Sequence, residues 1–488
     1  MVIKTRKSVP GHELLTGHEL LTVDDAHNLS PLQVRDLYTQ YVNRAQASLL
    51  GAFGFGQDVA VRAEGCWIEL SSGRRILDAT GGLGVLNHGH NHPRIIAARK
   101  RFQEQGRMEV HKSFLSPYVG ALSANIARLL PGDLNISYFP NSGAEAVEGA
   151  LKLAYKYHGG LRQTVLHSDI SFHGKLLAPG SITGSPENHF DFPGLPHKSS
   201  FVYDDIESIE DKIRHHTEQG KCDVYAIIVE PFSASMFLGC SERFLRRLRE
   251  ICSAYDIVLV FDEVYTGWGK TGSLFHFMRY PDLVPDILVM SKSFGGGKAS
   301  ISGYVARDEI FRKAYDNLRD ATLHSSTYNG FGEETVTAME AVAIVVEDDY
   351  PTRARTVETT LGSSLADMRR RHPSLVQDVR GAGALFGLRF QSGPALPEAL
   401  LRAVPSALAR DKHLIEKLLI GAVMDALYVD HGILTFVTTN REPMLMIAPS
   451  LVVNETEMEA IAIALDKVLS RGRADLLTRF LYRRLRRR

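Results

Sequence analysis

Three short apolar runs in the middle of the chain constrain its fold more than any other feature. They read DVYAIIVEP (223–231), DIVLVFDEV (256–264) and DILVMSKSF (286–294). Nearly continuous apolar runs of this length are typical of strands that are buried on both faces of a parallel sheet. Helical patterns separate them, for example SERFLRRLREICSAY (241–255). This alternation predicts βαβ units and a layered α/β domain.

Weaker patterns lie on both sides of this region. Residues 58–78 suggest short strands with a turn at 71–73, and long helical patterns after about residue 335 precede a strand-like stretch at 379–390. We therefore predict four parts of the chain: an N-terminal arm (1–50), the N-terminal part of a small domain (51–80), a large domain (81–340) and a C-terminal small α+β domain with a basic tail (341–488).

The two ends of the chain carry unusual segments. The hexamer GHELLT occurs at 11–16 and again at 17–22. One repeat is too short for a solenoid, so we interpret it as a local duplication in a tolerant terminal segment. The last residues, FLYRRLRRR (480–488), form a basic amphipathic pattern. It is either a solvated helix end or a docking patch for an acidic partner or a membrane surface.

Composition excludes several classes of protein. With 488 residues and 44% hydrophobic composition the chain can bury a large core, and 56 basic residues balance 56 acidic ones, which gives no electrostatic argument for nucleic acid. No apolar stretch of about 18 residues predicts a membrane span, and the N-terminus lacks a secretory signal pattern. The four cysteines lie far apart without a CxxC pair, so we predict neither a disulfide framework nor a metal site, and we expect a cytoplasmic protein.

Two small-residue turns follow strand-like stretches. NSGAEA (141–146) follows NISYFP and opens a helical run, where free backbone N–H groups and the helix dipole favour a phosphate. FHG (172–174) follows TVLHSD, where Phe172 can stack on a planar ring and Gly174 lets the backbone approach closely. Alone, the first could be an ordinary helix start and the second ordinary core packing.

Two of the three apolar runs end in FDEVYTG (261–267) and SKSFGGG (291–297). Ligands of open α/β sheets bind outside the carboxyl ends of the strands. Asp262 would be costly there unless it were paired, and a protonated pyridine nitrogen is a suitable partner, because it lets the ring act as an electron sink. Lys292, placed among apolar residues, has its ammonium form disfavoured, so its amine becomes a better nucleophile and forms imines with aldehydes.

In their order along the chain, these motifs resemble those of the class III aminotransferases, which belong to the pyridoxal-phosphate (PLP) enzymes of fold type I. The resemblance covers roughly residues 50–470. Its nine motifs are ATGGLGVLNHGHNHPRI (79–95), NSGAEAVEGALKLA (141–154), FHG (172–174), VEP (229–231), FDEVYTGWGKTG (261–272), SKSFGGG (291–297), HSSTYNG (324–330), VRGAGALFGL (379–388) and IAPSLVV (447–453).

The resemblance implies a role for each matching residue. Lys292 would hold PLP as a Schiff base, and Asp262 would pair with the pyridine nitrogen. Phe172 would cover one face of the ring and Val264 the other. The remaining expected cofactor contacts are Ser142, Gly143 and Ala144 at the phosphate, Thr327 at the phosphate of a neighbouring subunit, Glu230 as an ordering residue, and His173 and Tyr265 beside the ring.

The resemblance also implies the fold and the reaction. The fold would be α/β, with a mostly parallel seven-stranded sheet flanked by helices in a large domain and a smaller α+β domain formed by the N- and C-terminal parts. An obligate homodimer is implied, with residues 81–85, including Leu83, lining the neighbour's pocket. The freed Lys292 would move a proton between the substrate carbon and the cofactor, giving ping-pong transfer through pyridoxamine phosphate.

Four positions depart from the family pattern. Met446 stands where amino-acid-selective members, such as those resembling ornithine or GABA aminotransferases, carry an arginine, and Ser450 replaces a proline of the same motif. Ser235 stands where such members often hold the glutamate that gates this arginine. Tyr265 replaces a common glutamine near the phenolic oxygen of the cofactor, with which a tyrosine hydroxyl can still bond. The loss of both partners predicts a less polar pocket without a carboxylate clamp.

These departures favour an amine, a diamine or an ω-amino compound, or the matching aldehyde or ketone, over an α-amino acid on one side of the reaction. A keto acid or amino acid co-substrate still needs a cation, for which Arg441 is the candidate; it is otherwise a solvated loop arginine. Two other functions stay open: an aminomutase, racemase or decarboxylase of the same fold, and a non-catalytic protein on the same scaffold, against which the intact lysine, aspartate and glycines argue.

Overall fold

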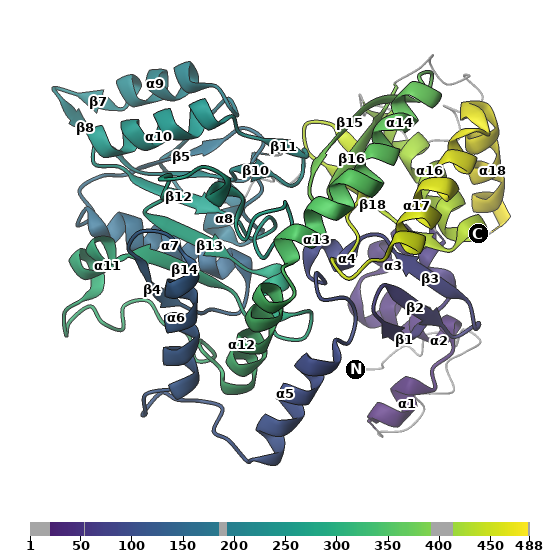
Figure 1. Ribbon diagram of the computed structural model, residues 1–488, viewed down its shortest axis with the longest axis horizontal. Coiled ribbons are helices and arrows are strands. Elements are labelled where there is room, and N and C mark those ends of the chain that lie inside the picture. Colours follow the sequence, from purple (N-terminus) through teal and green to yellow (C-terminus); the bar gives the residue numbers. More distant parts are fainter. Residues whose placement is uncertain (1–19, 53, 185–192, 392–412, 487–488) are drawn as a thin grey trace, which may run out of the picture.

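The computed structural model describes residues 20–52, 54–184, 193–391 and 413–486. Its largest sheet has seven strands in the order β4-β14-β13-β12-β9-β5-β6 (Figure 1). All pair in parallel except β14, which is antiparallel to β13 and β4. The strands are β4 (Leu134–Tyr138), β5 (Thr164–Ser168), β6 (Lys198–Phe201), β9 (Val224–Val229), β12 (Val258–Asp262), β13 (Ile287–Met290) and β14 (Gly303–Arg307). The mostly parallel seven-stranded sheet expected from the family resemblance is confirmed.

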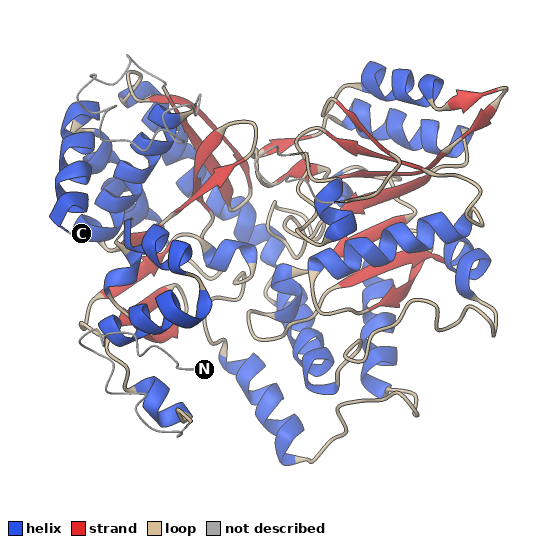
Figure 2. Cartoon of the chain, turned by 180° about the vertical axis from the view of Figure 1, so that it is seen from behind, coloured by secondary structure: helices blue, strands red, loops and turns tan. Residues whose placement is uncertain are grey.

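Both faces of this sheet are covered, which explains the continuous apolar runs. Along β12, Leu259 and Phe261 point into one core, whereas Val258 and Val260 point into another. The second core is closed by α7 and α11, and the first by α5, α6, α9, α10 and α12 (Figure 2). These helices are α5 (Pro93–Glu104), α6 (Pro117–Leu129), α7 (Gly143–Tyr157), α9 (Ile206–His215), α10 (Glu242–Ala254), α11 (Asp308–Tyr315) and α12 (Gly332–Glu347).

The smaller α+β part joins the two ends of the chain. Its first sheet runs β1-β2-β3-β17, and its second runs β15-β16-β19-β18. Strand β17 comes from the C-terminal region and pairs in parallel with β3, so the two ends share one sheet. The strands are β1 (Ala60–Glu64), β2 (Trp67–Leu70), β3 (Arg75–Asp78), β15 (Val376–Ala382), β16 (Leu385–Phe390), β17 (Ile433–Leu434), β18 (Phe436–Thr439) and β19 (Pro443–Ile447). A small domain built from both termini is therefore confirmed.

Helices cover these sheets on the right-hand side of Figure 1. They are α13 (Tyr350–Val357), η7 (Glu358–Gly362), α14 (Ser363–Arg371), α16 (Leu414–His431), α17 (Glu455–Leu469) and α18 (Gly472–Arg486). The N-terminal arm adds α1 (Val23–His27), α2 (Pro31–Leu37), η2 (Tyr38–Val42), α3 (Arg44–Ala52) and η3 (Phe55–Gln57). Shorter elements complete the chain: α4 (Gly81–Gly84), α8 (Leu177–Ser181), η5 (His276–Arg279), η6 (Lys292–Gly295), β7 (Thr217–Glu218), β8 (Lys221–Cys222), β10 (Phe232–Ser233) and β11 (Leu238–Gly239).

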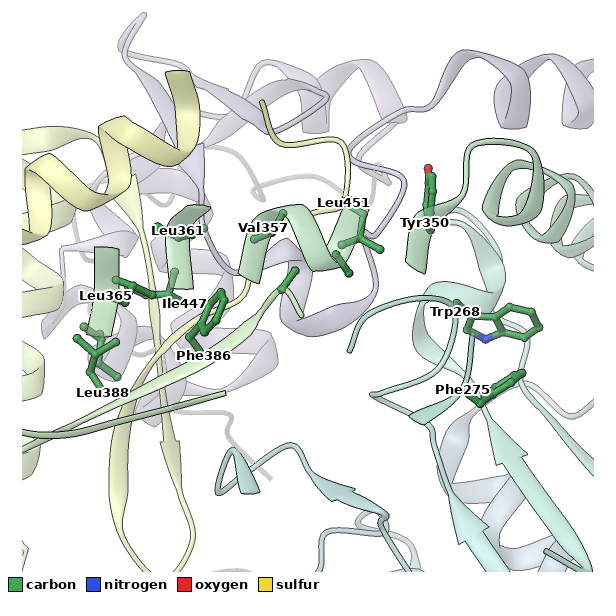
Figure 3. Packing of buried hydrophobic residues seen from close by; sticks show 14 of the residues in the cluster. Trp268, Phe275, Tyr350, Val357, Leu361, Leu365, Phe386, Leu388, Ile447 and Leu451 are labelled. Atoms are coloured by element: carbon green, nitrogen blue, oxygen red, sulfur yellow. The ribbon is translucent and has the colours of Figure 1, made fainter. Parts of the chain in front are cut away.

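The main hydrophobic core is continuous between the two parts of the molecule. In Figure 3, Val357, Leu361 and Leu365 follow one helical path that runs from the side of Trp268 past Phe386 to Leu388 of the small sheet. A polar link runs beside this core: the buried side chain of Lys270 donates hydrogen bonds to the carbonyl oxygens of Ala448 (3.2 Å) and Pro449 (2.6 Å). Burial lowers the pKa of Lys270 to about 7. The segment after β19 is thus anchored to the FDEVYTGWGKTG loop.

The division of the chain into four parts stays a proposal, because two of its limits fall inside helices. The limit after residue 50 lies within α3, and the limit after residue 340 lies within α12. The GHELLT repeat lies outside the described residues except for its last three. In the tail, Arg483 pairs with Asp425 and Asp430 of α16, so part of its charge is neutralised within the chain.

Two further observations bear on the expectations about membrane spans and disulfides. In the described part of the chain, no helix combines the length and the hydrophobicity that crossing a membrane requires. All four cysteines are free; Cys222 is half-buried, and Cys66, Cys240 and Cys252 are buried.

Candidate active site

Lys292 and Asp262 follow neighbouring strands of the large sheet. Asp262 is the last residue of β12, and Lys292 begins η6 two residues after β13. The parallel pairing of these strands brings the two residues to one edge of the sheet, where ligands of α/β proteins bind. Burial lowers the pKa of Lys292, whereas Asp262 and Glu230 oppose that shift by stabilising the ammonium form.

The backbone at Lys292 is unusual, and the glycines that follow it pack closely against their neighbours. Lys292 has φ +46°, in the left-handed region that residues with a side chain rarely adopt. A β carbon at Gly296 would lie 2.4 Å from Ile95 Cδ1, and one at Gly297 would lie 2.4 Å from Leu86 Cδ2. The SKSFGGG motif therefore brings the chain close to these two neighbours and turns Lys292 into the pocket.

His173, in the loop after β5, contacts Asp262. His173 Nδ1 lies 2.7 Å from Asp262 Oδ2, and both side chains are almost completely buried. The other carboxylate oxygen of Asp262 accepts the Val264 N–H at 3.0 Å. Among the described residues, His173 Nε2 is buried without a hydrogen-bond partner. The sequence placed His173 beside the cofactor ring; in the structure its contact is with the carboxylate that would face the ring nitrogen.

The N-terminus of α7 (Gly143–Tyr157) lies at the position predicted for the phosphate. Ser142 caps the helix in a capping box with Glu145, whose carboxylate accepts the Ser142 N–H at 2.8 Å. This leaves the N–H groups of Gly143 and Ala144 as the first-turn donors that are free within the described chain. A β carbon on Gly143 would lie 3.1 Å from Val264 Cγ1 and 3.3 Å from Ser291 Cβ, so the turn packs directly against the pocket wall.

Glu230 organises the loops around the pocket. Its buried carboxylate accepts the N–H groups of Phe172 (2.9 Å) and Ala234 (3.3 Å). Burial raises its pKa to about 7, against the opposing effects of His173 and of these two hydrogen bonds. Glu230 therefore holds the backbone that carries Phe172, in agreement with the ordering role expected for the VEP motif.

These residues surround one cavity of about 590 Å³, a size typical of small-molecule sites. It brings together eleven of the predicted site residues: Leu83, Gly143, Ala144, Phe172, His173, Glu230, Asp262, Val264, Tyr265, Lys292 and Met446. Ser142 lies beside it as the helix cap. A second hollow of about 630 Å³, between α14 and α17, contains none of these residues.

The structure also gives the positions of residues 81–85, Thr327 and Arg441 relative to the pocket. Gly82, Leu83 and Val85 line the pocket of their own chain, and the expectation that residues 81–85 serve the neighbour's pocket stays a prediction. Thr327 is exposed and lies outside this chain's pocket, and its role toward a second subunit stays a prediction. Arg441 forms an ion pair with Asp169, is half exposed and is not part of the cavity wall.

The pocket wall includes residues that the sequence did not indicate. Phe436, Val437 and Thr438 line it from β18, a short strand with no motif, and Lys175 lines it directly after the FHG motif. The position of Lys175 directly after the glycine of the FHG motif was the one sequence signal that could have identified it as a pocket residue. Ser235 also lines the cavity, and its hydroxyl accepts a hydrogen bond of 2.7 Å from Asn440.

A buried lysine, a buried carboxylate, an aromatic side chain and a helix N-terminus in one cavity are the arrangement expected of a fold type I PLP enzyme. The donor set fits the cofactor, since the free N–H groups of α7 suit a phosphate and the buried Asp262–His173 pair suits a cationic ring nitrogen. The sequence matches the aminotransferase class-III family over residues 56–469, and the chain belongs to this family. PLP is accordingly its cofactor.

Individual relatives agree with this assignment. The aminotransferase PigE of Serratia sp. (strain ATCC 39006) is 28% identical over 460 residues, which cover 89% of this chain but 53% of PigE, so the chain spans about half the length of that relative. An (S)-enantioselective omega-transaminase from Thermomicrobium roseum is similar in structure (TM-score 0.72, 25% identity, 85% of this chain and 92% of that one). The ornithine aminotransferase of Toxoplasma gondii shares the fold (TM-score 0.75, 23% identity, 92% and 97%).

Proposed function

We propose that this chain transfers an amino group between an amine, a diamine or an ω-amino compound, or the matching aldehyde or ketone, and a keto acid or amino acid. The observation that carries the proposal is the character of the cavity. Lys292 and Asp262 meet at one end, and Met446 and Phe436 form an apolar wall, while none of the described residues lining the cavity is an arginine. The cavity thus combines the residues for amino transfer with an apolar wall that suits an alkyl chain better than a carboxylate.

Each residue of the site has its own role in the proposed reaction. When bound, PLP supplies an aldehyde that accepts the donor's amino group and later passes it to the acceptor, which gives ping-pong kinetics. Lys292 would hold the aldehyde carbon and, once free, would take and return the proton of the substrate carbon as general base and acid. Asp262, supported by His173, would stabilise positive charge at the ring nitrogen. The N–H groups of Gly143 and Ala144 would hold the phosphate.

The apolar wall supports a donor without an α-carboxylate. Met446 is buried, and its sulfur accepts the hydroxyl hydrogen of Tyr265 at 3.4 Å, so the two departures from the family pattern are in direct contact. A carboxylate placed against this wall would lose water without gaining a cationic partner, which is strongly unfavourable. An alkyl chain there would gain from burial instead.

A matched pair of donors tests this proposal. We expect n-pentylamine to convert the visible band of the holoenzyme at least about 10-fold faster than norleucine, which is the same amine with an α-carboxylate, because burying an unpaired charge costs more than 1.4 kcal/mol. The decay of the band after mixing is followed by spectrophotometry, and the aldehyde product is identified. Faster conversion by norleucine would refute the substrate assignment, and isomerisation or carbon dioxide release without amino transfer would favour the alternative chemistries of this fold.

The carboxylate of the keto acid co-substrate needs a cation, and Lys175 is a better candidate than Arg441. Lys175 is exposed and lines the cavity, whereas the guanidinium of Arg441 is paired with Asp169. We expect Lys175→Ala to raise the KM for pyruvate about 10-fold, the effect of losing one charge-assisted hydrogen bond. Arg441→Ala is the matched control and should leave this KM unchanged; the opposite result would return the role to Arg441.

We also propose a homodimer and a cytoplasmic location. The exposure of Thr327 outside the pocket of its own chain supports a role toward a second copy. The free cysteines of the described chain support a reducing compartment.

A further inference from the structure

Tyr265 occupies a position that contacts both the reactive lysine and the substrate wall. Lys292 Nζ lies 4.6 Å from the centroid of the Tyr265 ring, within the range of a cation–π interaction. The backbone of Gly84 packs against the same ring, because a β carbon there would lie 2.8 Å from ring atoms Cε1 and Cζ. It would also lie 3.1 Å from Lys292 Cδ. The absence of a side chain at Gly84, which has φ +89°, therefore gives the ring and the lysine chain room to lie together.

The hydroxyl of Tyr265 points away from this contact. It donates to Met446 Sδ at 3.4 Å, and burial raises its pKa, so the phenol stays neutral. Sulfur is a weak acceptor. This bond nevertheless fixes the direction of the ring, which leaves a ring face for the lysine nitrogen.

The charged groups around Lys292 come from three other loops. Asp262 ends β12, Glu230 follows β9, and His173, in the loop after β5, is hydrogen-bonded to Asp262. The two carboxylates favour a cation at the lysine nitrogen, whereas burial disfavours it. An aromatic ring face acts in the same direction as the carboxylates without adding a charge.

We propose that Tyr265 is a positioning residue for Lys292, whose ring face holds the lysine nitrogen in its cationic form at the floor of the pocket. This inference rests on the proposed function, in which Lys292 alternately carries and releases a proton. Glutamine, the residue expected at this position from the family resemblance, has no ring face, so this chain would stabilise its lysine in a different way.

A pH titration of the visible band of the holoenzyme tests the proposal. Tyr265→Phe keeps the ring and removes the hydroxyl, whereas Tyr265→Leu and Tyr265→Gln remove the ring. Because loss of the ring removes a stabiliser of the cation, we expect the midpoint of the band's titration to move to lower pH by about 0.5–1 unit in the Leu and Gln variants. The Phe variant should stay within about 0.2 unit of the unsubstituted enzyme.

Each outcome decides the question. Equal midpoints in all four proteins would overturn the proposal, and so would a shift in the Phe variant as large as that in the Leu variant, because the hydroxyl would then be responsible. Circular dichroism and the height of the band report folding and cofactor loading, and the Gln variant provides the comparison if the Leu variant fails to load. An unsubstituted enzyme without a Lys292-dependent band would overturn the proposed function as well, whereas a band with equal midpoints would overturn only this inference.

Discussion

Replacing Lys292 by alanine is expected to lower kcat for amino transfer by about 10⁴-fold and to abolish the visible absorption of the bound cofactor. The variant loses both the amine that bonds to the aldehyde and the group that moves the proton, and general acid–base catalysis alone contributes about 10²–10⁴-fold. The effect should be on kcat, because the phosphate cradle at α7 is untouched. Absorption spectra and steady-state kinetics of the purified variant measure both quantities.

A nearby lysine provides the control for this experiment. Lys298 is exposed, and its side chain has no hydrogen bond or ion pair within the described part of the chain. Lys298→Ala removes the same charge six residues further along and should leave the band and kcat unchanged. A Lys292→Ala variant that is folded, keeps the band and transfers amino groups at the normal rate would rule out the proposed reaction.

Asp262→Asn should lower kcat by about 10²–10³-fold and also lower Tm, because its amide NH₂ would face either His173 or the Val264 N–H. The substitution keeps the shape of the side chain, but it removes the charge that would stabilise a protonated ring nitrogen. Losses of this size are typical when one preorganised electrostatic group is removed from an active site. Kinetics and thermal unfolding on the same preparation separate the two effects.

The adjacent acid offers a contrasting variant. Glu263 is fully buried, and its carboxylate accepts the Thr266 hydroxyl (2.7 Å) and the N–H groups of His276 (2.6 Å) and Phe277 (2.8 Å). Glu263→Gln places an amide donor against these donors, which should destabilise the fold by about 1–3 kcal/mol while the folded protein keeps its kcat. If Glu263→Gln lost activity and Asp262→Asn did not, the roles assigned to the two carboxylates would be wrong.

The central strands of the fold could be predicted because both of their faces are buried. The apolar runs at 223–231, 256–264 and 286–294 contain β9, β12 and β13. Edge strands gave a weaker signal: β6 reads KSSF and is largely exposed or half-buried. The pairing of β17 with β3 could not be predicted, because a two-residue strand has no period and its partner lies about 350 residues earlier.

The cofactor side of the site was more predictable than the substrate side for a related reason. Lys292, Asp262 and the α7 cradle lie at the ends of strong elements, so their sequence context locates them. The wall formed by Phe436 and Val437 comes from a four-residue strand in a local hairpin with β19, and this hairpin is placed by the long-range pairing of β19 with β16. Arg441 had the correct charge but was already paired with Asp169, a residue 272 positions away, which no local pattern reveals.

The hydrogen bonds from Lys270 to the segment after β19 have a practical consequence for changing the substrate range of the enzyme. Met446 lies in the same segment as the two carbonyl oxygens that accept hydrogen bonds from Lys270, whereas Lys292 and Asp262 lie at the edge of the large sheet. Exchanging side chains at Phe436 or Leu83 changes the shape of the pocket wall, whereas exchanging Met446 would also remove the acceptor of the Tyr265 hydroxyl, and with it a support of Lys292. Libraries at Phe436 and Leu83 are therefore the direct way to adapt the pocket to new amines while Lys292 and Asp262 keep their surroundings.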